Sequence, residues 1–568
     1  MDKPVTIGEA LRIDNASFTY AGSGVAALRG VNLKQNAGEM IGVMGASGAG
    51  KSTLAKLLNR IIPELEGGDL HGVVMLGGRS IAASHVRDLA RDIGMVFQDF
   101  ESQLFSTTVA HEVAFAMERV GMPREEIVAR LAPALEAVGL RGFEERDPTT
   151  LSGGQKQRLA IASVLALRPR VVVLDEPTTD LDPEGRSEVF ALIRRMRGEG
   201  TSLIVIEHEA EELRQCDRII ILRDGAIFAE GPPAEVFPRI EQLEDCGINP
   251  PSLDRVGKML GIAEHPVSVA DAEAGIRKLL AHAPSATDAL PFIAAPVPSQ
   301  EKLILEVEAA SFSYPEGPRV LDRMSLKLTA GEFIAIVGQN GSGKTTLAKM
   351  TVGLLAPDSG SILLEGRDRT TLRPAETAHE IGYVFQNPDH QIFADTVEAE
   401  VKFGPRNFGL DEREVEARCA EVLAAVGLGN ERATDPFLLG KGQRQRLAVA
   451  SVLALRPRLL ILDEPTTGLD YREQRKMMKL VSELNAAGVA IVMITHTPWL
   501  VAEYARRVIL MRAGHKLFDG PVREFFVQDE LLRASSFKPP EVTTLGRRFG
   551  VLALSATELV DALRGRPR

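Results

Sequence analysis

The sequence predicts an α/β fold written twice in one chain, and three observations support this. The glycine-rich pattern G-x-x-x-x-G-K-[ST] occurs at Gly45–Ser52 (GASGAGKS) and again at Gly338–Thr345 (GQNGSGKT). Each copy follows a short apolar run, Met40–Met44 or Phe333–Val337, as expected of a buried strand that leads into a loop and a helix. The later motifs VFQ and LDEPTT also occur once in each half, at the same spacing from one another. The chain is therefore predicted to contain two tandem copies of one domain.

Composition limits the classes of function. The chain has 568 residues, of which 25% are charged and 45% hydrophobic, as in an ordinary globular protein. Its net charge of −11 argues against a protein that coats nucleic acid, because such proteins are usually basic. Three widely spaced cysteines suit a reducing compartment.

No segment predicts a signal peptide or a membrane span. The start, MDKPVTIGEALRID, has no apolar core. The strongest apolar run, Leu159–Leu167, is much shorter than the roughly 18 residues that cross a bilayer. If the protein works at a membrane, we expect another chain to supply the membrane-spanning part.

Each half divides into similar parts. Alternating apolar residues near the start of each half predict a small antiparallel β subdomain. Short apolar runs such as VVVL and LLIL predict buried parallel strands, with helical patterns between them. Similar segments, INPPSLDRVGKMLG and FKPPEVTTLGRRFG, predict a small helical tail domain after each half. We expect a first α/β domain at 1–235, a tail at 236–280, a Pro- and Ala-rich linker at 281–300, a second α/β domain at 301–525 and a second tail at 526–568.

The glycine loops are predicted to bind phosphate through their backbone. Glycines let consecutive N–H groups converge on phosphate oxygens, and the helix that follows adds its positive N-terminal end. Lys51 and Lys344 neutralise phosphate charge, and Ser52 and Thr345 place a hydroxyl on Mg²⁺. The predicted nucleotide contacts of the two loops are Gly45, Gly48, Gly50, Lys51, Ser52 and Thr53, and Gly338, Gly341, Gly343, Lys344, Thr345 and Thr346.

Carboxylates at strand ends predict the metal and the chemistry. Asp175 and Asp463 end apolar strands, where an aspartate can hold Mg²⁺. Glu176 and Glu464 follow them and can orient or deprotonate an attacking water. An isolated Asp-Glu pair is usually only a polar strand end, but this pair recurs with the same EPTT continuation.

Three further residue types recur in both halves. Gln98 and Gln386 follow apolar runs and can reach the metal or the water with an amide. His208 and His496 end strands and are candidate catalytic residues that sense the terminal phosphate, although a single histidine at such a place is more often structural. The tyrosines before the two glycine loops could stack on adenine or could simply be core residues; they are Tyr20 and Tyr314.

The segment Leu151–Gln155 (LSGGQ), taken with these motifs, resembles the signature of the ATP-binding-cassette (ABC) ATPases. The resemblance covers both halves and implies two tandem P-loop ABC nucleotide-binding domains with ATP and Mg²⁺ as cofactors. In that family two ATPs lie between two cassettes, and each signature helix faces the opposite phosphate loop. One chain with two cassettes could therefore pair them intramolecularly. The implied signature contacts are Ser152, Gly153, Gly154 and Gln155 in the first half, and Gly442 and Gln443 in the second.

The second signature departs from the family pattern. It reads Leu439–Gln443 (LGKGQ), so Gly440 stands where a serine hydroxyl would meet the terminal phosphate, and Lys441 stands for a glycine. The helix N-terminus would still point at phosphate and lysine would add positive charge. The two composite sites are thus expected to be unequal.

A further segment narrows the resemblance. NPDHQIFADTVEAEVKFGP, after Gln386, resembles the ATPases of energy-coupling factor (ECF) importers for vitamins, cobalt or nickel, and the first half has the weaker match DFESQLFSTTVAHEVAFAM. The resemblance implies a fused ATPase on the cytoplasmic face of the cell membrane. Its partners would be a transmembrane coupling protein (T component) and a substrate-binding membrane protein (S component), with no nucleic acid and no direct contact with the cargo. We expect Gln103–Phe105 and Gln391–Phe393 to line the docking grooves, with Glu101 and Asp389 able to pair with a partner arginine.

Two alternatives stay open. The chain could be the fused ATPase of a sugar or peptide importer, although such proteins often have one degenerate phosphate loop and both loops are intact here. It could also be a soluble twin-cassette ATPase that acts on ribosomes or in repair. The short apolar linker and the lack of cysteine clusters are not typical of that class.

Overall fold

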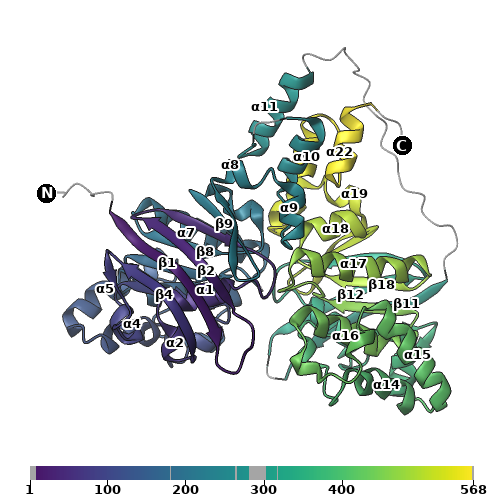
Figure 1. Cartoon of the computed structure of the whole chain (residues 1–568). Coiled ribbons are helices and arrows are strands. Elements are labelled where there is room, and N and C mark those ends of the chain that lie inside the picture. The colour runs from purple at the N-terminus through teal and green to yellow at the C-terminus, as the bar shows by residue number, and fades with distance from the viewer. Residues whose placement is uncertain (1–7, 180, 263–264, 281–301, 316, 566–568) are drawn as a thin grey trace. The chain divides into compact units, whose positions relative to one another are not determined.

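The computed structural model describes residues 8–179, 181–262, 265–280, 302–315, 317–565 (Figure 1). The chain divides into two compact units, one of 1–283 with 470–472 and the other of 284–469 with 473–568. The predicted linker at 281–300 lies outside the described residues. Each unit is described by itself below.

The first unit contains two sheets. Its strands are β1 (Glu9–Tyr20), β2 (Leu28–Asn36), β3 (Met40–Met44), β4 (Gly68–Leu76), β5 (Arg79–Ser80), β6 (Ile93–Val96), β7 (Val171–Asp175), β8 (Ser202–Ile206), β9 (Arg218–Arg223) and β10 (Ala226–Gly231). One sheet has the order β2-β1-β4-β5 and is antiparallel. The other has the order β10-β9-β3-β8-β7-β6 and is parallel except for β10.

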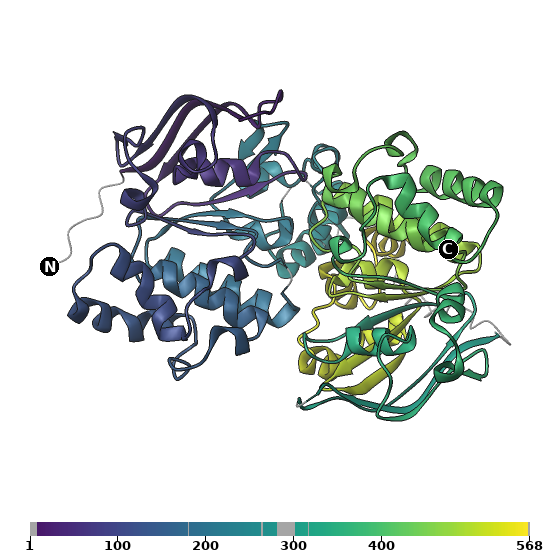
Figure 2. The ribbon, with the colours of Figure 1, turned by 90° about the horizontal axis from the view of Figure 1, so that it is seen from below.

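Helices connect these strands and follow them. They are α1 (Lys51–Leu58), α2 (Ile61–Glu64), α3 (Val86–Leu89), α4 (Val109–Arg119), α5 (Arg124–Ala137), α6 (Gly153–Leu165), α7 (Pro183–Gly198), α8 (Pro233–Val236), α9 (Ile240–Asp245), α10 (Ser252–Leu260) and α11 (Val269–Leu280). Figure 2 shows the antiparallel sheet on one side of the first unit, the helices α4–α6 on the other, and the six-stranded sheet between them.

Alternation along the buried strands explains these layers. Val172 and Leu174 of β7 pack with the helical side, while Val171 and Val173 pack with the antiparallel sheet. Successive side chains of a strand point to opposite faces, so a strand buried on both faces must be apolar throughout. The run VVVL therefore forms the centre of two cores at once.

The second unit repeats this architecture. Its strands are β11 (Leu303–Ser313), β12 (Arg319–Thr329), β13 (Phe333–Val337), β14 (Ser359–Leu364), β15 (Arg367–Asp368), β16 (Ile381–Val384), β17 (Leu459–Asp463), β18 (Ala490–Ile494), β19 (Arg507–Arg512) and β20 (His515–Pro521). The sheet orders are β12-β11-β14-β15 and β16-β17-β18-β13-β19-β20. Its helices are α12 (Lys344–Thr351), α13 (Pro374–Glu380), α14 (Val397–Asn407), α15 (Glu412–Ala425), α16 (Lys441–Leu453), α17 (Tyr471–Ala486), α18 (Pro498–Tyr504), α19 (Val522–Phe525), α20 (Asp529–Ala534), α21 (Glu541–Arg547) and α22 (Ala556–Leu563).

The predicted fold class is confirmed: each unit is an α/β domain with a small antiparallel sheet, a helical subdomain and a helical tail. The expected domain boundaries stay a prediction. None of the helices that the structure describes is long and apolar enough to cross a membrane.

Close packing of α6 on β6 gives a first testable prediction. A Cβ added to Gly94 would overlap Val164 Cγ1, so Gly94→Ala is expected to destabilise the first unit by about 1–3 kcal/mol through overpacking. Adding Val164→Ala should recover much of that loss. The measurement is urea unfolding followed by circular dichroism. Gly198→Ala is the control, because nothing lies within 4 Å of its added Cβ. Equal midpoints for Gly94→Ala and the control would contradict the prediction.

Candidate functional site

The first glycine loop joins β3 to α1 and is curled around its own lysine. Lys51 Nζ donates hydrogen bonds to the carbonyl oxygens of Gly45 at 2.9 Å and Ala46 at 3.0 Å. A Cβ at Gly45 would overlap the carbonyl oxygen of Leu222, and Gly50 has a φ of 101°, so both positions require glycine. Burial lowers the pKa of Lys51, although Glu176 and Asp175 oppose this shift. The loop is a preformed anion cradle at a helix N-terminus.

The second loop, between β13 and α12, has the same geometry. Lys344 Nζ donates to the carbonyl oxygens of Gly338 at 2.8 Å and Gln339 at 2.9 Å. The predicted adenine tyrosines lie beside the first turns of the following helices. The hydroxyl of Tyr20 is 3.2 Å from Thr53 Oγ1, and that of Tyr314 is 3.4 Å from Thr346 Oγ1. Their stacking on adenine stays a prediction.

Asp175 ends β7 next to the first loop. It is 3% exposed, and its Oδ1 is buried without a hydrogen-bond partner among the residues that the structure describes. Burial raises the pKa of Asp175 to about 6, while a hydrogen bond from Ser52 opposes the shift. A buried carboxylate oxygen beside a hydroxyl is a fitting ligand set for Mg²⁺, a hard cation that prefers oxygen. Ser52 and Asp175 would hold the metal here, and Thr345 and Asp463 in the second unit.

Glu176 is held as a carboxylate in a strained backbone position. Its φ is 49°, in the left-handed region that costs energy for a residue other than glycine. His208 Nε2 lies 2.7 Å from Glu176 Oε1, and Gln98 Nε2 donates to Oε2 at 2.7 Å. Burial raises the pKa of Glu176, but hydrogen bonding and the charge of His208 outweigh it and lower that pKa to about 2. Three predicted site residues are therefore joined in one network.

The second unit repeats the glutamate–histidine part of this network with looser alignment, but among the described residues Gln386 makes no hydrogen bond to Glu464. Glu464 also has a φ of 49°, and His496 Nε2 lies 2.8 Å from its Oε1, although without the angular geometry of a hydrogen bond. Thr467 Oγ1 donates to Glu464 Oε2 at 3.0 Å. His496 lowers the pKa of Glu464 against the opposing effect of burial.

The two signature helices begin differently. Ser152 is the N-cap of α6: its hydroxyl accepts from Gln155 N at 3.3 Å, while Gln155 Oε1 accepts from Ser152 N at 3.0 Å. At α16 only the bond from the N-cap backbone to the glutamine side chain is present, from Gly440 N to Gln443 Oε1 at 3.0 Å. A glycine N-cap costs the helix only a few tenths of a kcal/mol, so the fold tolerates the loss of the hydroxyl.

Lys441 and the neighbouring glycine have defined surroundings within the second unit. The Lys441 ammonium lies against Gly468, at the place where a Cβ on that glycine would be. A Cβ at Gly442 would lie 2.8 Å from Glu473 Oε2, so a larger residue there would require the Glu473 side chain to shift. The family resemblance also implies a loop at the cassette interface, the D-loop, at Thr179–Asp182 and Thr467–Asp470; residue 180 lies outside the described residues.

Sequence reasoning missed two polar residues of these sites, one partly buried and one fully buried. Tyr383 of β16 donates from its hydroxyl to Asp463 Oδ2 at 3.0 Å, where the first unit has Met95. Glu207, at the end of β8, is 3% exposed and precedes His208, where the second unit has Thr495. A comparison of the two halves position by position would have singled out both.

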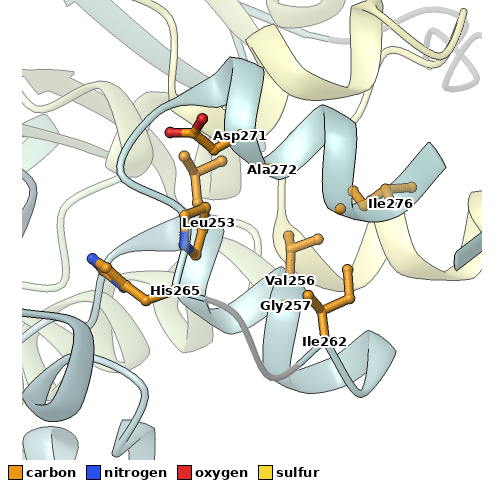
Figure 3. A pocket seen from close by; sticks show the side chains of 10 residues that line it. Leu253, Val256, Gly257, Ile262, His265, Asp271, Ala272 and Ile276 are labelled. Atoms are coloured by element: carbon orange, nitrogen blue, oxygen red, sulfur yellow. The ribbon is translucent and has the colours of Figure 1, made fainter. Parts of the chain in front are cut away.

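The pocket in Figure 3 lies elsewhere, in the tail of the first unit. Its cavity of about 60 Å³ is lined by residues of α10, α11 and the segment between them, Leu253, Val256 and Ile276 among them. None of the predicted site residues lines it.

The comparisons with known proteins agree with this geometry. A model of the ABC transporter family matches the chain twice, at residues 28–179 and 321–467. The chain belongs to the ABC transporter family. An ABC transporter ATP-binding protein of Caldanaerobacter subterraneus subsp. tengcongensis is 45% identical over 95% of this chain and 96% of its own length. Another, of Methanosarcina acetivorans, is 39% identical over 100% of this chain and 95% of its own.

A solved structure is similar to part of the chain. It is cbiO1 of Clostridium perfringens, described as part of the ABC transporter complex cbiONQ. It is 34% identical and covers 44% of this chain and 98% of its own, with a TM-score of 0.39. The family assignment rests on the family match and on the full-length relatives.

As an ABC ATPase, the chain binds ATP with Mg²⁺ and hydrolyses it. The loop N–H groups and the lysine ammonium are placed where they would bind and neutralise phosphate. The carboxylate of Glu176 or Glu464 stays ionised at neutral pH and can orient water and accept its proton. Mg²⁺ held by the strand-end aspartate and the loop hydroxyl would supply further neutralisation of phosphate charge.

The Tyr383 hydroxyl gives a second prediction. Loss of a hydrogen bond to a metal-binding carboxylate typically weakens metal binding by about 10- to 100-fold. Tyr383→Phe is therefore expected to raise the Mg²⁺ concentration for half-maximal ATP hydrolysis by about 10-fold. Mn²⁺ binding in the presence of ATP, followed by electron paramagnetic resonance, should weaken in parallel. Tyr504→Phe is the control, since the Tyr504 hydroxyl contacts Arg475 and not the site. Unchanged metal dependence would rule out this role.

Proposed function

We propose that this chain is the fused energising ATPase of an ECF-type importer. It would bind peripherally to the cytoplasmic face of the membrane through a T component and energise uptake of a micronutrient selected by an S component. The observation that carries the proposal is the N-P-D-H-Q-I-F segment with TV-x-x-EV-x-FG after it, and its partial repeat in the first half. The cargo class, a vitamin, a vitamin precursor, or Co²⁺ or Ni²⁺, follows from this resemblance.

The geometry of that segment supports a docking role. Phe393 is 59% exposed, and its ring packs edge-on against Phe403 with a centroid distance of 4.7 Å. In the first unit Phe105 is 62% exposed and packs in the same way on Phe115, at 4.5 Å. Exposed aromatic residues of this size are typical anchors of protein interfaces. We call Phe105 with Phe115 and Phe393 with Phe403 the aromatic pairs.

Buried glutamates hold these loops. Glu400 of α14 is 3% exposed, and its Oε2 accepts from the backbone N–H of Phe393 at 3.0 Å and of Ala394 at 2.9 Å. Glu112 of α4 holds Phe105 and Ser106 in the same way. The glutamate of the TV-x-x-EV motif therefore fixes the loop that exposes the aromatic ring.

Two observations favour the aromatic rings over the other residues of these segments as docking groups. The amides of Gln103 and Gln391 have internal partners: Gln103 Oε1 accepts from Phe97 N at 3.3 Å, and Gln391 Nε2 donates to the carbonyl oxygen of Ala448 at 2.8 Å. The acidic residues proposed to pair with a partner arginine already have internal partners. Glu101 pairs with Lys156 at 2.9 Å, and Asp389 with Arg444 at 2.7 Å. We therefore assign docking to the aromatic pairs.

We further propose that the two cassettes pair with each other, as the family resemblance implies. The phosphate loop of the first cassette would then face the altered signature with Gly440 and Lys441, and that of the second cassette would face Ser152–Gln155. Hydrolysis requires the terminal phosphate to be held from both sides. The second site has the complete set of groups, so it would carry more of the turnover.

A third prediction tests docking. Phe105→Ala with Phe393→Ala should reduce co-purification with the membrane proteins encoded beside this chain by about 10-fold or more, because buried aromatic anchors contribute about 2 kcal/mol or more each. ATP binding should be unchanged. Phe228→Ala is the matched control, since Phe228 is 38% exposed on β10 and away from these loops.

The outcome separates the alternatives. Retained co-purification of the double variant would refute the docking assignment. If the co-purified membrane partner imports a sugar or a peptide, the docking assignment would stand, but the ECF assignment would be replaced. Sedimentation of the wild-type chain with ribosomes, and not with membranes, would replace the importer proposal altogether.

A fourth prediction ranks the two sites. Loss of the water-orienting carboxylate should slow its own site by roughly 10²–10⁴-fold. Glu464→Gln should therefore nearly abolish steady-state phosphate release by the assembled complex, whereas Glu176→Gln should leave a larger residual rate. A larger loss from Glu176→Gln would reverse the ranking. Equal losses of phosphate release in the two variants would mean that the two sites hydrolyse ATP only in a tightly coupled way.

A further inference from the structure

Glu207 is a buried acidic residue to which none of the steps above assigns a role. It follows β8 directly, precedes His208 and is 3% exposed. In the second cassette the residue that precedes His496 is Thr495. A buried carboxyl group is costly unless it is hydrogen-bonded, so its surroundings should explain why it is there.

Its two carboxyl oxygens join two loops of the first cassette. Oε1 accepts from Thr178 Oγ1 at 2.7 Å and from Thr178 N at 3.2 Å, in the loop that follows Glu176. Oε2 accepts from His208 N at 3.3 Å. The partners in both loops are donors, which the ionised carboxylate can satisfy and a protonated acid can satisfy only in part.

The second cassette is built differently at this position. Thr495 Oγ1 accepts from Thr497 N at 3.1 Å, within its own loop. The hydrogen bond is local, and threonine cannot ionise at neutral pH. The two cassettes therefore differ in the charge beside the histidine as well as in their signatures.

Charged groups from several elements face Glu207. Arg186 of α7 and His208 favour the carboxylate, while Glu176 disfavours it, and Lys51 of α1 lies close enough to be affected by its charge. Arg186 also pairs with Glu209 at 3.8 Å. Burial is the largest influence and raises the pKa of Glu207 to about 7, so this group changes charge near neutral pH.

We propose that Glu207 is a positioning residue of the first cassette, whose carboxylate ties the backbone of His208 to the loop after Glu176 and so sets the contact between those two side chains. Protonation removes the charge that holds the donors and loosens the tie. The first site is then regulated by pH in a way that the second is not. This inference requires only ATP hydrolysis, and it stands whether or not the chain serves an importer.

The test exchanges the residues of the two cassettes. Steady-state phosphate release is measured from pH 6 to pH 9 for the wild-type chain and for Glu207→Thr, Glu207→Gln and Thr495→Glu. A single group with a pKa of about 7 changes its ionised fraction about 10-fold between pH 6 and pH 8. Glu207→Thr and Glu207→Gln should each remove from the pH profile a change in rate between pH 6 and pH 8 of up to this size. Thr495→Glu should add a change of this kind.

A background with the first site disabled gives the control. In Glu176→Gln, the further change Glu207→Thr should leave the pH profile unaltered, because Glu207 acts through the first site. Infrared spectra of the full chain without nucleotide report the group directly. The wild type should lose a carboxylic-acid C=O band between pH 6 and pH 8 that Glu207→Gln lacks.

Two outcomes would overturn the proposal. The first is a set of superimposable pH profiles for the wild type, Glu207→Thr and Glu207→Gln, even if all three differ in absolute rate. A uniform loss of rate at every pH would indicate a structural role only. The second is an infrared band that is the same in wild type and Glu207→Gln. Should Thr495→Glu fail to fold, the two Glu207 variants still decide.

Discussion

Both sites depend on one constraint, which is that β3, β7 and β8 are parallel, adjacent and buried on both faces. The carboxyl ends of parallel strands lie at the same edge of a sheet. The groups that follow these strands are therefore close in space although they are far apart in the sequence. The phosphate loop follows β3, Asp175 ends β7, and His208 comes soon after β8. The same edge in the second unit collects the corresponding loop, Asp463 and His496. The remaining residues of each site modify the surroundings of the groups that this edge brings together.

Because the domain occurs twice in the chain, the surroundings of corresponding site residues can be compared between the two units. The left-handed backbone conformation at Glu176 and Glu464 is the same in both units, which favours a shared role for the two residues. The surroundings differ: a tyrosine hydroxyl supports Asp463, whereas Asp175 keeps a buried oxygen without a hydrogen-bond partner. A cassette pair with unequal halves can give each nucleotide its own lifetime.

The sequence predicted the fold class and the family because their signals are local. Glycine spacing, apolar runs and strand-end carboxylates need only a few consecutive residues to be recognised. It could not predict that Glu101 pairs with Lys156, because this contact joins elements far apart in the chain. The same holds for the reach of Tyr383 to Asp463. The bond between Gln103 and the backbone of Phe97 is local, but it depends on a loop conformation that carries no recognisable sequence pattern. The roles of the predicted site residues in binding and hydrolysis stay predictions.

The buried glutamates behind the aromatic pairs have a mechanical consequence. Because Glu112 fixes the loop of Phe105, and Gln103 holds that loop to the backbone next to Gln98, the exposed ring and the amide that contacts Glu176 belong to one stiff segment. A stiff segment loses little conformational entropy when a partner binds it. In such a segment, a displacement of the Gln98 amide at Glu176 would be transmitted to the surface of the cassette as a shift of the Phe105 ring.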